Sequence, residues 1–204
     1  MIEVERLSAS GIKSYRECEK QFWYKYVSDV EPPTEGKIEH FEVGNAVHES
    51  IENALQNNDD IASLDQETVL ALLQEEEDNL EYDYQDNDKV DDCLELASKF
   101  ISKYVSKIVS VEDEFEMNIG GIDFIGYADL VADLEIDGKT YNDVIVDWKT
   151  GQINDEWKEK IQGGMYVKMF NEETGRWPDS IKFVYLNEDT DSTHNRIDDG
   201  DVMW

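Results

Sequence analysis

The first half of the chain carries apolar residues at the intervals of three and four that are typical of helices. The first predicted helix begins at a Ser8 or Ser10 N-cap and ends at Val27. Three further stretches predict helices over residues 44–57, 64–80 and 93–109. Residues 1–110 are therefore expected to form a mainly helical region.

After residue 110 the apolar positions alternate, which is typical of strands. The expected elements are two strands between Val111 and Leu134 that turn at Gly120-Gly121, a strand over 141–149 that follows an Asp137-Gly138 turn, a helix over 156–171 and a strand over 181–186. We therefore expect a single α/β domain over residues 1–204, with a sheet core at 111–186 and a polar tail at 187–204.

The composition is that of a folded chain with a large negative charge. Hydrophobic residues make up 40% and aromatic residues 11% of the 204 positions, which excludes wholesale disorder. The 49 acidic and 18 basic residues give a net charge of −31, so the surface should repel nucleic acids and anionic membranes at ordinary salt. Either the partner is not a polyanion, or the protein works at salt concentrations that screen its own field.

Targeting signals and cysteines indicate the compartment. No run of about 18 apolar residues occurs, so no membrane partner is expected. Residues 1–10 lack the charged start and apolar run of a signal peptide. Only Cys18 and Cys93 occur, far apart and outside any CxxC, and two cysteines cannot make a disulfide framework or a four-thiolate cluster. We expect a protein of the reducing cytoplasm, which is the host cytoplasm if the chain is viral.

The candidate chemistry lies near the end of the third predicted strand. Asp147 and Lys149 stand two residues apart in VIVDWKTG, so they project from the same face of a strand. A neighbouring strand that brings Asp129 alongside would place two carboxylates and an ammonium in one pocket. Such oxygen ligands suit Mg²⁺ or Mn²⁺. Taken alone, the Asp-x-Lys triplet is more often a surface salt bridge at a strand end.

Five segments together carry a resemblance to a known family. They are LSASGIKSYRECEKQFWYKYV from residue 7, GNAVHES from residue 44, VEDEFEMNIGGIDFIGYADLV from residue 111, VIVDWKTG from residue 144 and QGGMY from residue 162. In order and spacing this set resembles the RecB-like nucleases of the PD-(D/E)XK superfamily, which include phage exonucleases and CRISPR-adaptation nucleases. The resemblance implies a restriction-endonuclease-like core, in which helices flank a central mixed sheet, preceded by an N-terminal helical region.

The resemblance also implies a set of metal ligands. His48, Asp129 and Asp147 would ligate a divalent metal, Mg²⁺ or Mn²⁺, together with the carbonyl of Trp148. A lone histidine on a helix is more often a packing residue, but Gly44 and the companion segments favour a ligand role for His48. A first-strand glutamate completes the set, and we expect Glu112 to fill that place in preference to Glu114 or Glu116.

Catalysis and DNA contacts are implied in the same way. Lys149 would be the catalytic lysine. Gln162 and Tyr166 are four residues apart on a predicted helix, and they would orient the active site or DNA. The alternative for this pair is a structural contact between the helix and the sheet.

Two absences limit the expected cofactors. Many relatives hold an iron–sulfur cluster with one cysteine near the first helix and three near the C-terminus. Cys18 occupies the first place, but no cysteine follows Cys93, so no iron–sulfur cluster is expected and Cys18 should pack as a small apolar residue. No P-loop or GxGxxG segment occurs, so no nucleotide cofactor is expected either.

A DNA partner has to be reconciled with the net charge. Lys13, Arg16 and Lys20 are spaced to share one face of the first predicted helix and are expected to contact phosphates. Lys158 and Lys160 are expected near the site with Lys149, whereas the lysines at 99, 103 and 107 are expected to be an ordinary solvated face. We attribute the acidity to a salty cytoplasm, that of a halophile or its virus.

The sequence therefore predicts a metal-dependent DNA nuclease, with exonuclease action favoured over endonuclease action. Recombination, repair and phage replication are the expected settings, and a helicase or recombinase is an expected protein partner. Two alternatives are a non-catalytic acidic DNA mimic and a structural nuclease-fold module in a larger complex. Oligomeric state is not specified by these residues.

Overall fold

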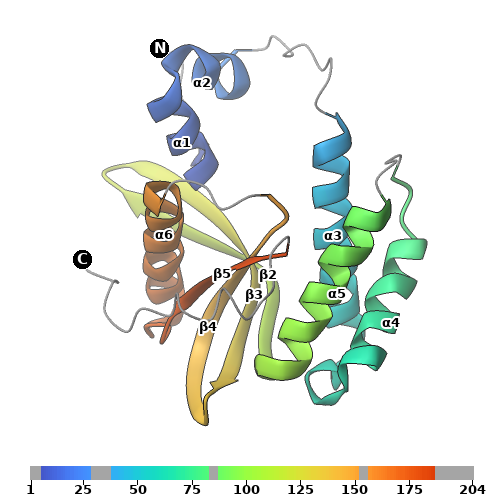
Figure 1. The fold of residues 1–204 in the computed structure, drawn as a ribbon. Coiled ribbons are helices and arrows are strands. Elements are labelled where there is room, and N and C mark those ends of the chain that lie inside the picture. The colour runs from blue at the N-terminus through green and yellow to red at the C-terminus, as the bar shows by residue number, and fades with distance from the viewer. Residues whose placement is uncertain (1–5, 29–37, 83–86, 152–155, 187–204) are drawn as a thin grey trace. The chain divides into compact units, whose positions relative to one another are not determined.

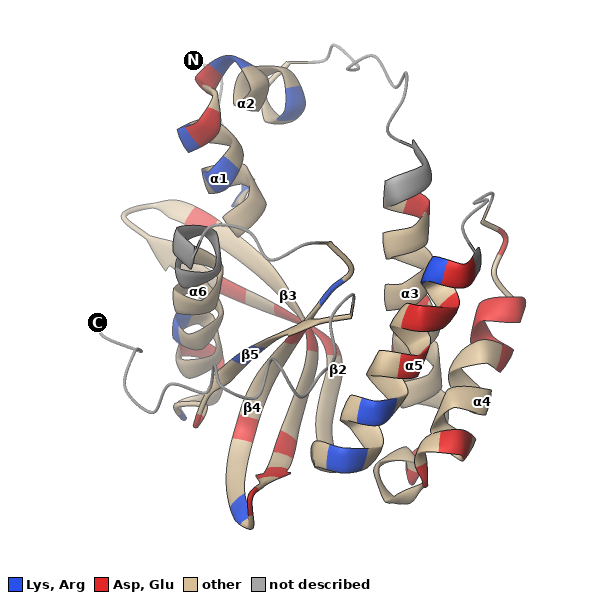
Figure 2. Ribbon diagram, in the orientation of Figure 1, with Lys and Arg blue, Asp and Glu red and all other residues tan. Residues whose placement is uncertain are grey.

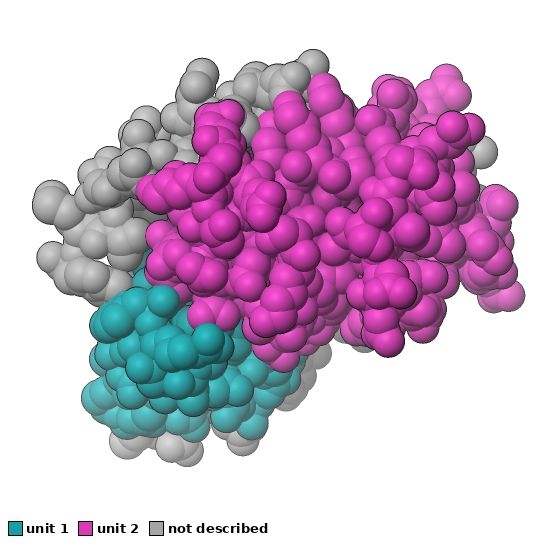
Figure 3. Space-filling model, turned by 90° about the horizontal axis from the view of Figure 1, so that it is seen from below, with its two compact units in different colours: residues 1–35, 114–127, 154–177 teal, residues 36–113, 128–153, 178–204 magenta. Residues whose placement is uncertain are grey.

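The computed structural model describes residues 6–28, 38–82, 87–151 and 156–186. The chain forms two compact units (Figure 3). Unit 1 comprises residues 1–35, 114–127 and 154–177, and unit 2 comprises residues 36–113, 128–153 and 178–204. Among the described residues, none of the helices has the length and apolarity that a membrane span requires.

The elements confirm the expected α/β class, in which helices flank a central mixed sheet (Figure 1). In chain order they are β1 (Arg6–Leu7), α1 (Ala9–Glu17), α2 (Glu19–Tyr26), α3 (Ile38–Asn57), a 3₁₀ turn (Ile61–Ser63), α4 (Gln66–Asp78), α5 (Asn87–Tyr104), β2 (Val105–Ile119), β3 (Ile122–Ile136), β4 (Lys139–Lys149), α6 (Glu156–Thr174) and β5 (Ile181–Tyr185). The strand order is β1-β3-β4-β5, and β2 also pairs with β3.

The sheet of unit 2 is built around β4. Strand β4 pairs antiparallel with β3, where Leu130 lies opposite Val146, and parallel with β5, where Asp147 lies opposite Phe183. Residues 143–148 of β4 are all buried. Because both of its neighbours are strands, β4 has no free edge and forms the rigid centre of the unit.

Helices α3, α4 and α5 form the second layer of unit 2 and lie side by side in Figure 1. Their apolar stripes pack into one core with the alternate β4 residues Val144, Val146 and Trp148. The ring of Phe100 on α5 meets the Trp148 indole edge to face, with the ring centroids 5.4 Å apart. Aromatic pairs in this geometry add stabilisation beyond the area that they bury.

Unit 1 has a separate, smaller core between α6 and residues 114–127, where β2 and β3 meet at their turn. Phe170 on α6 meets Phe115 on β2 edge to face at 5.8 Å between ring centroids. The short strand β1 pairs parallel with the start of β3. Gly126 on β3 lies under the ring of Tyr166, and a Cβ atom at this glycine would lie 2.7 Å from that ring. The absence of a side chain therefore lets α6 pack closely on this strand.

The predicted helices differ from the observed ones in their bounds, most of all the first helix and the one predicted over 93–109. Ser8 is the N-cap of the first helix, and its hydroxyl accepts a hydrogen bond from Gly11 N at 3.1 Å. However, the predicted helix over 8–27 is two helices, because Cys18 adopts an extended conformation with φ −160° and ψ 107°. Cys18 is also exposed, so the expectation that it packs as an apolar residue was wrong. Residues 105–109 belong to β2, since this segment, in which three of the five residues are Val or Ile, pairs with a strand instead of continuing α5.

Lys182 on β5 is a buried cation in the core of unit 2. Its residue is 4% exposed, and its ammonium group has no hydrogen-bond partner among the described residues. The Nζ atom lies 5.9 Å from the ring centroids of both Phe100 and Tyr104. Burial lowers the pKa of the Lys182 ammonium to about 8. Contact with two aromatic faces offsets only part of the cost of removing this charge from water.

Replacing Lys182 with Met should therefore stabilise the protein by about 1–3 kcal/mol at pH 7, as measured by urea unfolding. The gain should shrink as the pH rises from 8 towards 10, because folded Lys182 then loses its proton while the unfolded side chain keeps it. Lys103→Met is the matched control, since Lys103 is exposed and lies against the same Tyr104 ring at 4.9 Å. A gain that is absent, or equal at pH 7 and pH 10, would contradict this account of Lys182.

Candidate active site

Helix α3 approaches the end of β4 at Gly44. A Cβ atom at this position would lie 3.3 Å from Oγ1 of Thr150, closer than most such contacts. Gly44 and His48 are one helical turn apart and therefore share a face of α3. The spacing of Gly-x-x-x-His thus has a physical reason, because the glycine lets the helix lie close enough for the histidine to reach the sheet.

Three metal-type ligand groups converge within unit 2. His48 on α3, Glu112 on β2 and Asp129 on β3 each offer a ligand atom, and these atoms lie within 4.8 Å of one another. All three residues are partly buried. The three come from one helix and two strands, so their proximity depends on the tertiary fold.

Glu112 is held by an unusual backbone conformation. Its φ of 51° lies in the left-handed region, which costs roughly 1–2 kcal/mol for a residue with a Cβ atom. The two other first-strand candidates belong to unit 1, where Glu114 accepts a hydrogen bond from the Tyr127 hydroxyl at 2.6 Å and Glu116 pairs with Arg6 at 3.1 Å. Of the three glutamates, only Glu112 joins the cluster with His48 and Asp129.

The position of Asp129 is fixed by the backbone of β4. Its Oδ2 atom accepts a hydrogen bond from Trp148 N at 2.6 Å and lies 3.5 Å from Nδ1 of His48. The Trp148 indole is buried against the helical layer, so the amide that holds Asp129 is itself firmly placed. The structure thus shows Trp148 acting through its N–H, and the ligand role of its carbonyl stays a prediction.

Asp147 and Lys149 extend the site along β4. Their side chains project from the same face, and the Lys149 ammonium pairs with Oδ2 of Asp147. Asp147 is 3% exposed, so the pair is not the surface salt bridge that the triplet alone favoured. Phe183, opposite Asp147 on β5, places its ring centroid 5.4 Å from Nζ of Lys149 and so supports the lysine.

The site concentrates negative charge. Extending the pairing of Leu130 with Val146 by one residue brings Asp129 opposite Asp147, where like charges on neighbouring strands repel. Burial raises the pKa of the Asp147 carboxyl to about 6, although Lys149 acts against this rise. Two carboxylates in so little water are stable only if a proton or a cation joins them.

The neighbouring carboxylates also raise the pKa values of Glu112 and His48. Burial, Asp129 and Glu52 together raise the pKa of the Glu112 carboxyl to about 7. Burial lowers the pKa of His48. The charges of Asp129 and Asp147 and the hydrogen bond to Asp129 raise it by more, so the net shift is upward. Sequence reasoning missed the influence of Glu52 on the site. Its position four residues after His48 on the same helix could have indicated that it lies on the same helix face.

The donor set fits a divalent cation. Carboxylate oxygens are the ligands that Mg²⁺ and Mn²⁺ prefer, and a neutral imidazole nitrogen is a common metal ligand. A cation would also offset the burial and the carboxylate repulsion that raise the pKa values of Glu112 and Asp147. The chemistry of the site and its electrostatics therefore point to the same kind of ligand.

Two other predicted site residues lie in unit 1. Gln162 Nε2 donates a hydrogen bond to the Tyr166 hydroxyl at 3.0 Å, so the four-residue spacing does bring them together. The Tyr166 ring packs on Gly126, which is the helix-to-sheet contact considered as the alternative. Their roles toward the active site and DNA stay predictions.

The predicted cationic face was partly wrong. Lys13 and Arg16 lie on α1, but Lys20 lies on α2 beyond the break at Cys18, so the three do not share one continuous helix face. The side chains of Lys158 and Lys160 lie outside the described residues. Their expected proximity to Lys149 also stays a prediction.

Comparison with known proteins identifies the family of the chain. The family model described as the PD-(D/E)XK nuclease superfamily matches residues 6–200, a stretch that contains every predicted site residue. No curated protein matches the chain. The match is to the superfamily, so the RecB-like subtype stays a prediction. With nearly its whole length matched, the chain belongs to the PD-(D/E)XK nuclease superfamily.

Proposed function

We propose that this protein is a metal-dependent deoxyribonuclease that hydrolyses phosphodiester bonds in DNA, and that it acts as an exonuclease. The observation that carries the proposal is the convergence of His48, Glu112 and Asp129 within 4.8 Å, beside the buried Asp147–Lys149 pair. Recombination, repair or phage replication is the proposed setting. A helicase or recombinase partner and a cytoplasmic location are part of the same proposal.

His48, Glu112, Asp129 and Asp147 would hold the divalent cation, Mg²⁺ or Mn²⁺, with the carbonyl of Trp148 as a further ligand. When bound, such a cation supplies positive charge beside the scissile phosphate and lowers the pKa of water. The Trp148 N–H keeps the Asp129 carboxylate in place while DNA binds and leaves. The site is therefore preorganised by backbone and strand geometry, which favours catalysis.

Lys149 is the residue that we assign to charge stabilisation in the reaction. Its ammonium is tethered by Asp147 and supported by the Phe183 ring, so it keeps one position at the end of β4. From there it would orient the attacking water and donate a hydrogen bond to a phosphate oxygen as negative charge grows on it. Gln162 and Tyr166 are proposed to orient the active site or the DNA.

Cleavage of end-labelled linear DNA and of closed circular DNA, each with Mg²⁺ or Mn²⁺, tests the proposal. The wild type should degrade linear DNA and leave circles intact. Asp147→Ala and Lys149→Met should each lose at least about 100-fold in rate, since each removes a charge that acts in the transition state. Lys149→Met keeps the aliphatic stem against Phe183, so its circular dichroism should stay near that of the wild type, although its melting temperature should fall because buried Asp147 loses its ammonium partner.

Each other outcome contradicts a different part of the proposal. Nicking of circles would make the protein an endonuclease. A folded Lys149→Met protein that cleaves as fast as the wild type would refute the role of the lysine. If the folded wild type cleaves nothing with either metal, the acidic DNA mimic or the structural module takes its place.

Salt should increase cleavage before it inhibits it. The net charge of −31 repels DNA at low salt, whereas at about 1 M salt the Debye length falls to roughly 3 Å and only direct contacts survive. Initial rates measured from 0.05 M to about 2 M KCl should therefore peak at elevated salt. A maximum at the lowest salt, followed by steady loss, would contradict the proposed adaptation to a salty cytoplasm.

Metal affinity should fall as the pH is lowered. Because burial and neighbouring charges raise the pKa of Glu112 to about 7, this carboxyl is largely ionised at pH 8 and largely protonated at pH 6. Protons and metal compete for it, so Mn²⁺ binding measured by calorimetry should weaken about tenfold or more between these two pH values. Glu112→Gln should bind Mn²⁺ more weakly at pH 8 and lose part of the pH dependence.

The matched control is Glu116→Gln, which removes an exposed carboxylate from the same strand. This variant should bind Mn²⁺ as the wild type does at every pH. Equal wild-type affinity at pH 6 and pH 8, or equal weakening by the two glutamine substitutions, would show that Glu112 is not a ligand.

A further inference from the structure

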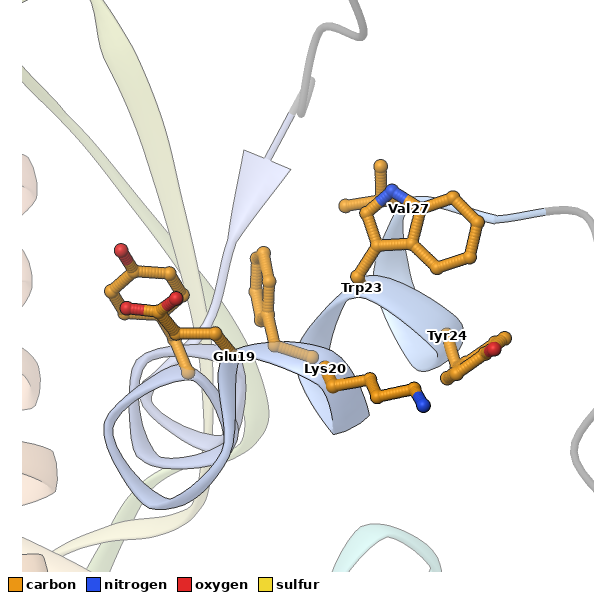
Figure 4. Close-up of a pocket in the computed structure, with 7 residues that line it drawn as sticks. Glu19, Lys20, Trp23, Tyr24 and Val27 are labelled. Carbon is orange, nitrogen blue, oxygen red and sulfur yellow. The ribbon is translucent and has the colours of Figure 1, made fainter.

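Helices α1 and α2 of unit 1 form an open aromatic cleft of about 520 Å³ (Figure 4). Aromatic rings, two charged side chains and one valine line it: Tyr15, Glu19, Lys20, Phe22, Trp23, Tyr24 and Val27. In Figure 4 the Lys20 side chain extends toward Tyr24, while Glu19 points the opposite way. The cleft therefore presents rings and one cation together.

The rings of this cleft are unusually exposed for their size. Tyr15 is 51% exposed, Trp23 43% and Tyr24 39%. Large aromatic side chains are normally well buried in a folded protein, so a group of exposed ones indicates a binding surface. The ring centroids of Trp23 and Tyr24 are 5.1 Å apart and the ring planes are inclined by 77° in an edge-to-face contact. Because both rings remain exposed, a flat ligand can stack on the face of either ring that is turned away from this contact.

The two helices that form this cleft have a net charge of opposite sign to that of the chain. Residues 9–26 contain four cationic and two anionic side chains, a local charge of +2 in a chain of −31 (Figure 2). The cations are interleaved with the rings, since Nζ of Lys20 lies 5.8 Å from the Tyr24 centroid and Nζ of Lys25 lies 5.2 Å from the Tyr26 centroid. A polyanion with flat apolar groups is the ligand that fits such a surface.

We propose that the α1–α2 cleft binds single-stranded DNA, whose bases stack on Trp23 and Tyr24 while Lys20 contacts the phosphate backbone. The inference rests on the proposed nuclease function and specifies its substrate as DNA with a single-stranded segment. In a duplex the base faces are covered by neighbouring bases, so only an unpaired strand can lay them on protein rings. Stacking needs no particular base, and hence this cleft provides affinity without sequence preference.

The cations beside the rings favour DNA over the other possible occupant, an apolar segment of a partner protein. An apolar segment would need only the aromatic rings for its contacts. When it bound, the cations beside the rings would lose hydrating water and gain no anionic partner. Phosphates compensate those cations directly. The surface thus has two components of a single-strand site, a stacking platform and a cation, Lys20, beside its rings.

Binding of a fluorescein-labelled 20-nucleotide oligo-dT to the full-length chain in EDTA tests this proposal, because binding is then measured without cleavage. Trp23→Ala combined with Tyr24→Ala should weaken binding by about 100-fold, about tenfold for each ring. Binding of a 20-base-pair duplex should change little. Lys20→Gln should lower the salt dependence of oligo-dT binding by about 0.7 in the slope of log K against log salt.

Trp177→Ala is the matched control. Trp177 also belongs to unit 1, is 52% exposed and has a lysine, Lys168, with its Nζ 6.0 Å from the ring centroid, but it does not line the cleft. This variant should bind oligo-dT as the wild type does. Trp23→Phe with Tyr24→Phe keeps the stacking faces and should retain most of the affinity, which guards against misfolding of the alanine variant.

Several results would overturn the inference. They are unchanged oligo-dT binding by the alanine variant, an equal loss for Trp177→Ala, an equal loss for the duplex, and no oligo-dT binding by the wild type at any salt. The nuclease proposal fails separately, by an absence of metal-dependent cleavage. A wild type that cleaves DNA but binds oligo-dT independently of these rings would refute the cleft alone, and one that binds through the rings without cleaving would refute the nuclease alone.

Discussion

The candidate site depends on holding carboxylates together at the end of a buried strand. The register of β3 and β4, extended by one residue beyond Leu130 and Val146, brings Asp129 across from Asp147. Asp147 is buried and Asp129 is partly buried, so their mutual repulsion has to be opposed by fixed partners. The Trp148 N–H binds one carboxylate and the Lys149 ammonium binds the other. Alternation along β4 makes this possible, because Trp148 anchors the strand in the helix-side core while Asp147 and Lys149 project from the other face. The apolar packing of unit 2 thus determines where the charges meet.

Much of this arrangement follows from local sequence pattern. Alternating residues and turn glycines are enough to predict β3 and β4, and the two-residue spacing is enough to predict that Asp147 lies beside Lys149. The place of His48 depended on the resemblance of five segments, since a single histidine on a helix does not indicate a partner. Gly44 then proved to have a steric reason, the close approach of α3 to Thr150. The sequence prediction and the structure thus agree where apolar and polar residues alternate regularly, as they do in β3 and β4.

The remaining features come from tertiary forces that no local pattern encodes. The break at Cys18 interrupts a segment whose residues favour one helix, and the Val105 segment pairs with a strand in spite of the helical run before it. Glu112 adopts a left-handed backbone conformation, which is sterically unfavourable for any residue other than glycine. Glu52 influences the site only through space, by its charge on Glu112. Each of these is decided by packing or charge between elements far apart in the sequence.

The strained backbone of Glu112 and the crowded carboxylates around it have a consequence for how this protein evolves. Both features oppose folding, so substitutions that relax them should give a more stable chain that has lost the ligand geometry of the candidate site. Random drift would therefore tend to erase the site while preserving the fold. Keeping His48, Glu112, Asp129, Asp147 and Lys149 together therefore works against the thermodynamic preference of the scaffold.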